Sequence, residues 1–454
     1  MVLAGGKMNS LWLIAMTVNL FGPYQAAPSP PRSRDVVFFA PESDTFLFPG
    51  PPSPRIICRT FQRALSLEWS VSRNRVDIPF LSGSAKIRFD NSFEITIPGD
   101  KLEPGFFDLR VAVKLNEHET LPAATTFGWR ETETKVHPLL PADFLAFWSA
   151  ARKHLEAIPP DPQVTFERVL RGDELGRYNV TSARMPENYD PEGERVSEVE
   201  VYKVRFASYG GKTIEGWFAK PPGPGPFPTL LVLPGAGNVA RAIPIEHARH
   251  GFAALDVQIH GFPVDATEYP PVPDDMGAKH PEEKAHFGLY LHALQAARAL
   301  KLLPAVDRSR LAVLGGSQGG RLTLIVAAFD SDFRAAIPAI THFAYLPWLR
   351  DTDRLNAAKL PGDGPFVGNA DPSPSLRIEG YFDVLNFAPL VRCPVLMNAG
   401  LIDRVSPPTG IYAVYRALGG EKQIIPLPNT AHDWSPAFDR YAWRWLEATL
   451  NPRK

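Results

Sequence analysis

The sequence is poor in cysteine, in net charge and in long apolar runs, and each shortage argues against a class of protein. Its 454 residues include two cysteines, Cys58 and Cys393, too few for a disulfide framework or a cysteine-rich metal site. Lys and Arg number 48 against 49 Asp and Glu, so the net charge of -1 gives no general attraction for nucleic acid. Beyond the N-terminus, no run reaches the roughly 18 apolar residues of a membrane-spanning helix.

Apolar residues and proline are abundant instead. Apolar residues make up 44% of the chain and charged residues 21%, which suffices for a large core. At a typical ~150 residues per domain, the length predicts two or three folded units. The 47 prolines predict many fixed turns and few long uninterrupted helices.

Residues 1–27 have the features of a secretory signal peptide. Lys7 precedes an apolar run from Leu11 to Phe21, which is too short to span a bilayer, and Gln25-Ala26-Ala27 leads into a proline-rich stretch. We therefore expect a secreted or periplasmic protein without stable membrane insertion. Because Gln25 is bulky for a cleavage site, an uncleaved anchor is the alternative.

Residues 36–131 have the period-two pattern of β-strands. Apolar Phe107, Leu109 and Val111 alternate with polar Asp108 and Arg110, and similar short runs are separated by Pro, Gly, Asn and Asp. This pattern predicts a small all-β, immunoglobulin-like sandwich domain. Its aromatic residues, Trp69 and Trp129, could bind carbohydrate, but core packing is the commoner role of such residues.

Residues 138–454 alternate helical and buried-strand patterns, which predicts an α/β domain with a mostly parallel central sheet. Cys58 and Cys393 fall in different predicted domains, each in an apolar run, so we expect two separate buried thiols. The expected helices carry Phe144, Phe147, Trp148, Ala151 and Leu155; Phe287, Tyr290, Leu291, Leu294 and Ala297; and Phe438, Tyr441, Ala442, Trp445 and Leu446. The expected strands are 229–233, 253–257, 311–314, 335–340, 393–399 and 423–427.

The sharpest chemical signal is the segment from Gly315 to Gly319, Gly-Gly-Ser-Gln-Gly, between a predicted strand and a predicted helix. A serine on such a turn is strained, and glycines two residues before and after it avoid steric collision. Ser317 is therefore the expected nucleophile. The helix that follows points its N-terminus at the same place, so the N–H of Gln318 is an expected oxyanion donor.

A serine nucleophile needs a base and an orienting carboxylate, which follow it in the order acid, then histidine, on this type of sheet. Asp403 follows the strand 393–399, and His432 follows the strand 423–427. Two other carboxylates fit less well, because Asp433 is adjacent to His432 and Asp383 precedes its strand. The second oxyanion donor is expected to be the N–H of Ala236, in the loop after the strand 229–233.

Histidines 247, 250, 260, 280, 286 and 292 lie close in sequence but lack the spacing and accompanying carboxylate of a zinc site. We therefore expect neither a metal nor another cofactor. His342, after the strand 335–340, is a candidate pocket residue, although a hydrogen-bonded loop histidine is the simpler interpretation.

The segment from Pro138 to the C-terminus resembles the acetyl xylan esterase and cephalosporin C deacetylase family of α/β-hydrolases. The resemblance rests on segments 141–148, 209–217, 315–320, 381–389 and 393–403. It implies a Ser317, Asp403 and His432 triad, with oxyanion N–H groups on Gln318 and Ala236. The chain departs from the family at Pro234-Gly235-Ala236, where a His-Gly-Tyr is usual, and at 256–261, where an Asp-x-Arg-Gly-x-Gly is usual. Loss of the tyrosine predicts a wider pocket.

The leading hypothesis is a secreted serine esterase that deacetylates xylan or another saccharide. One alternative is a prolyl-oligopeptidase-like serine peptidase, although residues 36–131 are too few for its usual propeller. Another is a catalytically decayed hydrolase that binds polysaccharide. The sequence does not predict the sugar, the acyl length or an oligomeric state.

Overall fold

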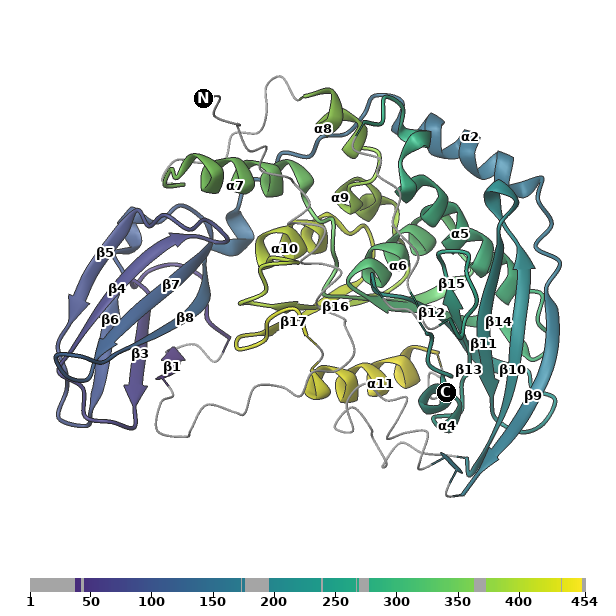
Figure 1. The fold of residues 1–454 in the computed structure, drawn as a ribbon, viewed down its shortest axis with the longest axis horizontal. Coiled ribbons are helices and arrows are strands. Elements are labelled where there is room, and N and C mark those ends of the chain that lie inside the picture. Colours follow the sequence, from purple (N-terminus) through teal and green to yellow (C-terminus); the bar gives the residue numbers. More distant parts are fainter. Residues whose placement is uncertain are drawn as a thin grey trace, which may run out of the picture.

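A computed structural model describes residues 37–41, 45–172, 174–175, 196–237, 240–266, 268, 277–362, 373–433 and 435–450. The expected signal peptide, residues 1–27, lies outside the described residues. The chain has a small β part at the N-terminal side and a larger α/β part (Figure 1).

The N-terminal part consists of two small sheets, in which every pair is antiparallel except β2 with β8. The predicted alternation is confirmed in the second half of β7, where Leu109, Val111 and Val113 are buried and Lys114 is exposed. Asp108 departs from it, because its carboxylate is buried and accepts hydrogen bonds from Asn74 and Thr126. One sheet has the order β1 (Val37–Pro41), β3 (Arg55–Thr60), β6 (Ser92–Thr96). The other has the order β2 (Leu47–Phe48), β8 (Thr120–Trp129), β7 (Gly105–Lys114), β4 (Ser66–Arg73), β5 (Leu81–Ala85).

The two parts share contacts, so the domain boundaries at 36–131 and 138–454 stay predictions. Phe106 of β7 packs on Tyr412, with 4.8 Å between the ring centroids. Both rings belong to one buried cluster that extends through the α/β part. Trp129 is buried there, as core packing requires, and Trp69 is partly buried across Gly83.

The α/β part contains a nine-stranded sheet of the order β17-β16-β15-β14-β12-β13-β11-β10-β9. Its first six strands are parallel, which confirms the predicted mostly parallel sheet, and the last three form an antiparallel edge that the sequence analysis did not assign. The bounds are β9 (Gln163–Arg171), β10 (Glu198–Ala207), β11 (Thr213–Lys220), β12 (Phe227–Leu233), β13 (Ala253–Gln258), β14 (Val306–Gly316), β15 (Phe333–Ala339), β16 (Val395–Gly400) and β17 (Lys422–Leu427).

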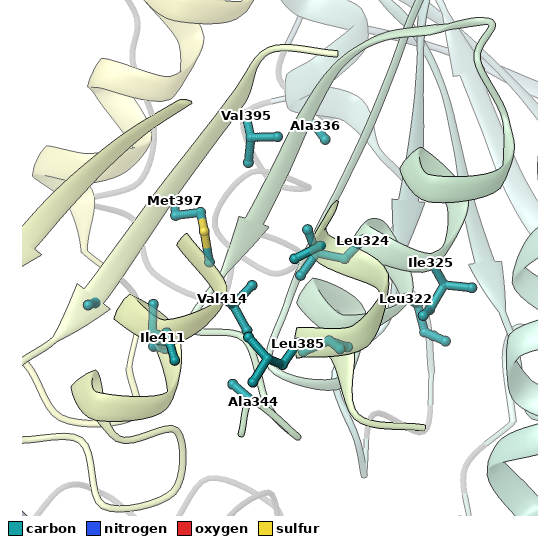
Figure 2. Close-up of a cluster of buried hydrophobic side chains, with 14 of the residues drawn as sticks. Leu322, Leu324, Ile325, Ala336, Ala344, Leu385, Val395, Met397, Ile411 and Val414 are labelled. Carbon is teal, nitrogen blue, oxygen red and sulfur yellow. The ribbon is translucent and has the colours of Figure 1, made fainter. Parts of the chain in front are cut away.

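Helices cover both faces of this sheet. One face carries α2 (Phe144–Glu156), α5 (Ala285–Leu300), α6 (Gln318–Phe329), α9 (Val384–Phe387) and α10 (Pro408–Ala417), and the other α4 (Ile245–Arg249) and α11 (Pro436–Leu450). Among the described residues, the remaining α-helices are α7 (Leu346–Ala358) and α8 (Pro374–Glu379). Figure 2 shows Leu322 and Leu324 of α6 in the cluster that also includes Val395 and Met397 of β16. No helix within the described ranges is both long and apolar enough to cross a membrane.

The helical patterns predicted from sequence are largely confirmed, with one correction. Trp148 of α2 is fully buried, and its Nε1–H donates to the carbonyl of Tyr381 at 3.0 Å. In α11, however, Tyr441 is exposed, and Trp443 is buried instead, stacked on His250 with 4.1 Å between the centroids. At 100° per residue, the buried stripe of Phe438, Ala442, Leu446 and Leu450 is centred nearer to position 443 than to position 441.

Both cysteines are unpaired, as expected. Cys58 is fully buried, and burial raises the pKa of its thiol to about 12. Cys393 is only partly buried, which corrects the expectation that both separate thiols are buried, and burial raises its pKa to about 11. A high thiol pKa means little thiolate and low reactivity near neutral pH.

The carboxylates of Glu246 in α4 and Asp439 in α11 are close enough for Glu246 to repel Asp439, and their titration predicts a pH dependence of stability. Burial raises the pKa of Glu246 to about 7. The pKa of Asp439 is raised to about 7, mainly by burial and to a smaller extent by repulsion from Glu246, while Arg440 opposes the shift. Since both folded-state values exceed the ordinary ones, this contribution to stability is complete below about pH 4 and is lost as the pH rises through about 7.

We expect Glu246→Gln to raise the free energy of unfolding by about 1 to 2 kcal/mol at pH 8 and by much less at pH 5. Urea denaturation of both proteins at the two pH values measures the difference. Glu156→Gln, at an exposed position near the end of α2, is the matched control. An equal gain in the free energy of unfolding at pH 5 and pH 8 would mean that the charge of Glu246 is not the cause of the gain.

Candidate active site

Ser317 lies on a strained turn between β14 and α6, as the sequence predicts. Its backbone has φ 58° and ψ -114°, a conformation that residues other than glycine rarely adopt. A Cβ atom at Gly315 would lie 2.5 Å from the carbonyl oxygen of Leu233, and one at Gly319 would lie 2.1 Å from the same oxygen. The two glycines therefore let the serine turn pack directly on the end of β12.

The structure brings the three predicted triad side chains together. His432 Nε2 lies 3.0 Å from Ser317 Oγ, and His432 Nδ1 lies 2.8 Å from Asp403 Oδ2. A carboxylate accepts only, so Nδ1 carries the proton and donates to Asp403, while Nε2 is free to accept from the serine hydroxyl. The His432 side chain is 9% exposed and the Asp403 side chain is fully buried. These distances fit proton transfer from the hydroxyl to the imidazole.

Local structure holds the acid and the base at one edge of the sheet. Asp403 follows β16, and its Oδ1 accepts the N–H groups of Val405 and Ser406, each at 2.8 Å. At the end of β16, a Cβ atom on Gly400 would lie 2.5 Å from the carbonyl oxygen of Thr430, so the strand passes against the loop that carries His432. The close passage explains how residues from consecutive strands reach each other.

The competing carboxylate Asp383 has a different place. It is fully buried and accepts the N–H groups of Tyr345, Leu346 and Leu385 at 2.7 to 3.0 Å. Burial raises its pKa to about 6, and these hydrogen bonds oppose the shift. Asp383 thus caps the starts of α7 and α9 and is not the partner of His432.

The two predicted oxyanion donors lie on adjoining segments. Gln318 is the first residue of α6, where N–H groups have no partner within the helix. Ala236 lies in the turn after β12. The side chain of Gln318 links these segments, because its Nε2 donates to the carbonyl of Pro234 at 3.4 Å. The catalytic role of the two N–H groups stays a prediction.

His260 is a further residue of the site that the sequence analysis did not assign. Its Nε2 lies 3.1 Å from Nε2 of Gln318, and its Nδ1 lies 2.9 Å from Oε1 of Gln258. An amide nitrogen only donates, so His260 accepts from Gln318 and donates to Gln258. Burial lowers the pKa of His260 to about 4, which keeps the imidazole neutral and able to accept near pH 7. The sequence signal was present in the departure from the family motif at 256–261.

Asp256, the first residue of the segment 256–261, has a structural role. Asp256 forms a buried, two-pronged ion pair with Arg241, at 2.6 and 2.9 Å. Arg241 follows the loop of Ala236 in sequence, and its N–H donates to the carbonyl of Val264 at 2.8 Å. The pair therefore joins the segments that follow β12 and β13, next to the predicted oxyanion loop.

We expect His260→Leu to lower kcat about tenfold with little change in KM, because a lost hydrogen bond of roughly 1 kcal/mol loosens Gln318. His260→Gln keeps an acceptor at this position and should retain most of the activity. Steady-state kinetics on a chromogenic acetate ester measure both variants. An equal fall in kcat in His260→Leu and His260→Gln would argue against loss of the hydrogen bond to Gln318 as the cause.

Three further histidines, His286, His292 and His342, have packing or hydrogen-bonding roles in the structure. His292 Nδ1 lies 2.7 Å from Ser208 Oγ, and burial lowers its pKa to about 4. His286 and His342 both pack against Phe343, at 4.7 and 4.8 Å between centroids, and the backbone N–H of His342 donates to the carbonyl of Ser317. His342 is therefore adjacent to the nucleophile turn. Across the ranges that the structure describes, no group of three His, Cys, Asp or Glu side chains could hold a metal.

Comparison with known proteins gives a family match over much of the chain. The family model for acetyl xylan esterase matches residues 173–449. The acetyl esterase Axe7A of Xylanibacter ruminicola is 25% identical over 385 residues, which span 81% of this chain and 79% of that protein. This alignment covers more of the chain than the family model does.

Solved structures agree with the family match. The acetyl xylan esterase of Paenibacillus sp. R4 superposes with a TM-score of 0.55 at 27% identity, over 70% of this chain and 98% of that chain. Acetyl xylan esterase 1 of Thermoanaerobacterium sp. JW/SL YS485 has a TM-score of 0.53 at 20% identity, over 69% of this chain and 95% of that one, and shows the same fold. These structures support the α/β-hydrolase fold predicted from the sequence.

Proposed function

The chain belongs to the acetyl xylan esterase family, and from this premise we propose that it is a serine esterase that removes acetyl groups from xylan or another acetylated saccharide. Membership of the family makes it a carboxylic ester hydrolase. The observation that carries the catalytic proposal is the hydrogen-bonded chain from Ser317 through His432 to Asp403.

In the proposed mechanism, His432 Nε2 takes the proton from the Ser317 hydroxyl as its oxygen attacks the ester carbonyl. Asp403 holds the imidazole in the productive tautomer and stabilises its cation. The N–H groups of Gln318 and Ala236 bind the negative oxygen of the tetrahedral intermediate, each contributing roughly 3 kcal/mol in the transition state.

The intermediate then collapses with loss of the alcohol, which takes the proton from His432. The acyl group stays on Ser317 as an ester. A water molecule, deprotonated by His432, attacks this ester and releases the acid, so that the free hydroxyl of Ser317 is restored. The chain's own side chains supply every proton transfer in this scheme.

The proposed substrate is the acetate ester of a sugar hydroxyl, as the names of the relatives suggest. Ala236 stands where the family usually has a tyrosine, which supports a pocket with one aromatic wall fewer. Acyl groups somewhat longer than acetyl should therefore be accepted as well. Secretion or export to the periplasm belongs to the same proposal and rests on the sequence of residues 1–27.

Hydrolysis of acetylated xylan and of chromogenic esters of increasing acyl length tests the proposal. We expect release of acetate from xylan and stoichiometric labelling of the protein by an organophosphonate, with loss of the label in Ser317→Ala. Cleavage of an aminoacyl-proline amide in preference to both esters would indicate a peptidase instead. Xylan binding without turnover or labelling would indicate a decayed hydrolase.

A further inference from the structure

The N-terminal β part contacts the loop that carries Asp403. Residues 73–77, at the end of β4 and the start of its connection to β5, lie against residues 403–406. We call residues 73–77 the anchor turn and residues 403–406 the acid loop. Both lie near α7 and α10, where the β part meets the rest of the molecule (Figure 1). The anchor turn lies outside residues 173–449, which the family model matches.

Arg404, the neighbour of Asp403, is held by three groups of the β part. Its Nη2 donates to Asp77 Oδ1 at 2.7 Å and to the carbonyl of Arg75 at 3.1 Å. Its Nη1 donates to Asp108 Oδ2 at 3.4 Å. An isolated exposed ion pair contributes little, but a guanidinium shared among three acceptors limits how far the loop that carries it can move.

The anchor turn also donates a hydrogen bond back to the acid loop. Arg75 donates from Nε to the carbonyl of Arg404 at 3.2 Å, and from Nη1 to Asp353 of α7 at 2.6 Å. Beyond the acid loop, the Thr409 hydroxyl of α10 donates to Asn74 Oδ1 at 3.0 Å. The acid loop is therefore fastened at Arg404 and again just after it, at Thr409.

The anchor turn is itself rigidly built. Asp108 of β7 is 7% exposed and accepts from the side chains of Asn74 and Thr126 and from the N–H of Arg75, at 2.9 to 3.0 Å. Asn356 of α7 adds a hydrogen bond to the carbonyl of Arg75 at 3.0 Å. The turn therefore has a fixed geometry against which the acid loop is set.

Asp403 depends on that geometry. Among the described contacts, its Oδ1 is held by N–H groups of the acid loop itself, those of Val405 and Ser406. Its Oδ2 faces His432. A change in the backbone of the acid loop would therefore turn the carboxylate relative to the imidazole.

We propose that the anchor turn is a positioning element for the catalytic acid, so that the N-terminal β part completes the esterase site through Arg75 and Arg404. This inference rests on the proposed triad. Arg75 and Arg404 are positioning residues, since neither touches the reacting atoms. The β part then has a catalytic purpose that does not require it to bind carbohydrate.

The test uses Arg404→Met and Arg75→Met in the full-length protein, with chromogenic acetate hydrolysis followed across pH. We expect kcat to fall about tenfold while KM changes by less than about twofold, because the reacting groups are misplaced and the substrate site is intact. The acid limb of the kcat profile should move to lower pH by about half a unit, because the imidazolium loses part of its carboxylate partner. Arg404→Lys, which keeps the charge, should recover part of kcat.

Arg88→Met is the matched control, since Arg88 pairs with Glu94 within the β part, at 2.9 Å, and should leave kcat and the pH profile unchanged. Unchanged kcat and pH profile in Arg404→Met and Arg75→Met would overturn the positioning role. A loss of activity that only follows a lower melting temperature, with no shift of the acid limb, would overturn it too. Failure of the proposed function would be separate, because the wild-type protein would then lack esterase activity or keep it in Ser317→Ala.

Discussion

Ser317→Ala is expected to lower kcat for acetate esters on the order of 10⁵-fold, because the variant lacks the hydroxyl on which the acyl-enzyme forms. Ser317 Oγ is the group within 3.0 Å of His432 Nε2, and the strained turn aims it at the sheet edge. The residual rate should come from the oxyanion donors and from binding. Burst kinetics with a chromogenic ester would show the wild-type acyl-enzyme and its absence in the variant.

A control for this experiment lies on the same strand. Ser309 of β14 donates from its hydroxyl to Asp307 at the exposed end of the strand, and Ser309→Ala should keep full activity. Ser317→Ala activity within about tenfold of the wild type would rule out the proposed nucleophile, since the serine contributes far more than that in a working triad.

Asp403→Asn is expected to lower kcat by roughly 10⁴-fold while the fold is retained. The N–H groups of Val405 and Ser406 already point at one carboxylate oxygen, so they would hold the asparagine oxygen on that side. The amide nitrogen would then face His432 Nδ1 and donate to it. The imidazole would carry its proton on Nε2 instead, where it could no longer accept from Ser317.

The pH dependence of kcat and a circular dichroism spectrum distinguish this tautomer effect from unfolding. Asp433→Asn is the control, since Asp433 neighbours His432 in sequence, whereas the carboxylate bonded to His432 Nδ1 is that of Asp403. We expect near wild-type activity in that variant. A larger loss of kcat in Asp433→Asn than in Asp403→Asn would show that Asp403 is not the catalytic acid.

Some features of the molecule were predictable because they depend on short stretches of chain. The strained turn at Ser317 requires glycines at fixed positions on either side, and these can be read directly from the sequence. The central parallel strands, such as β12 and β13, contain continuous apolar runs, and this pattern exists because both faces of the sheet are covered there by helices. Their order in the chain then indicated Asp403 and His432.

Other features were not predictable in this way. The antiparallel edge formed by β9, β10 and β11 has ordinary mixed patterns, and its pairing depends on which strands meet in space. At His260 the sequence shows only a departure from a family motif. Its role depends on the hydrogen bond between its ring and the side chain of Gln318, and only the fold brings these two residues together. Tyr441 and Trp443 differ by two positions, and the helix phase decided between them.

The sequence by itself determined the class of chemistry and the order of the parts, because a nucleophile turn, a buried sheet and a family pattern are each recorded in local residues. Only the tertiary structure decided what supports the acid. The side chains of Arg75 and Arg404 are more than 300 positions apart along the chain, yet each donates to the other's backbone carbonyl. Such a contact arises from how the β part packs on the sheet edge, and no local pattern of residues encodes it.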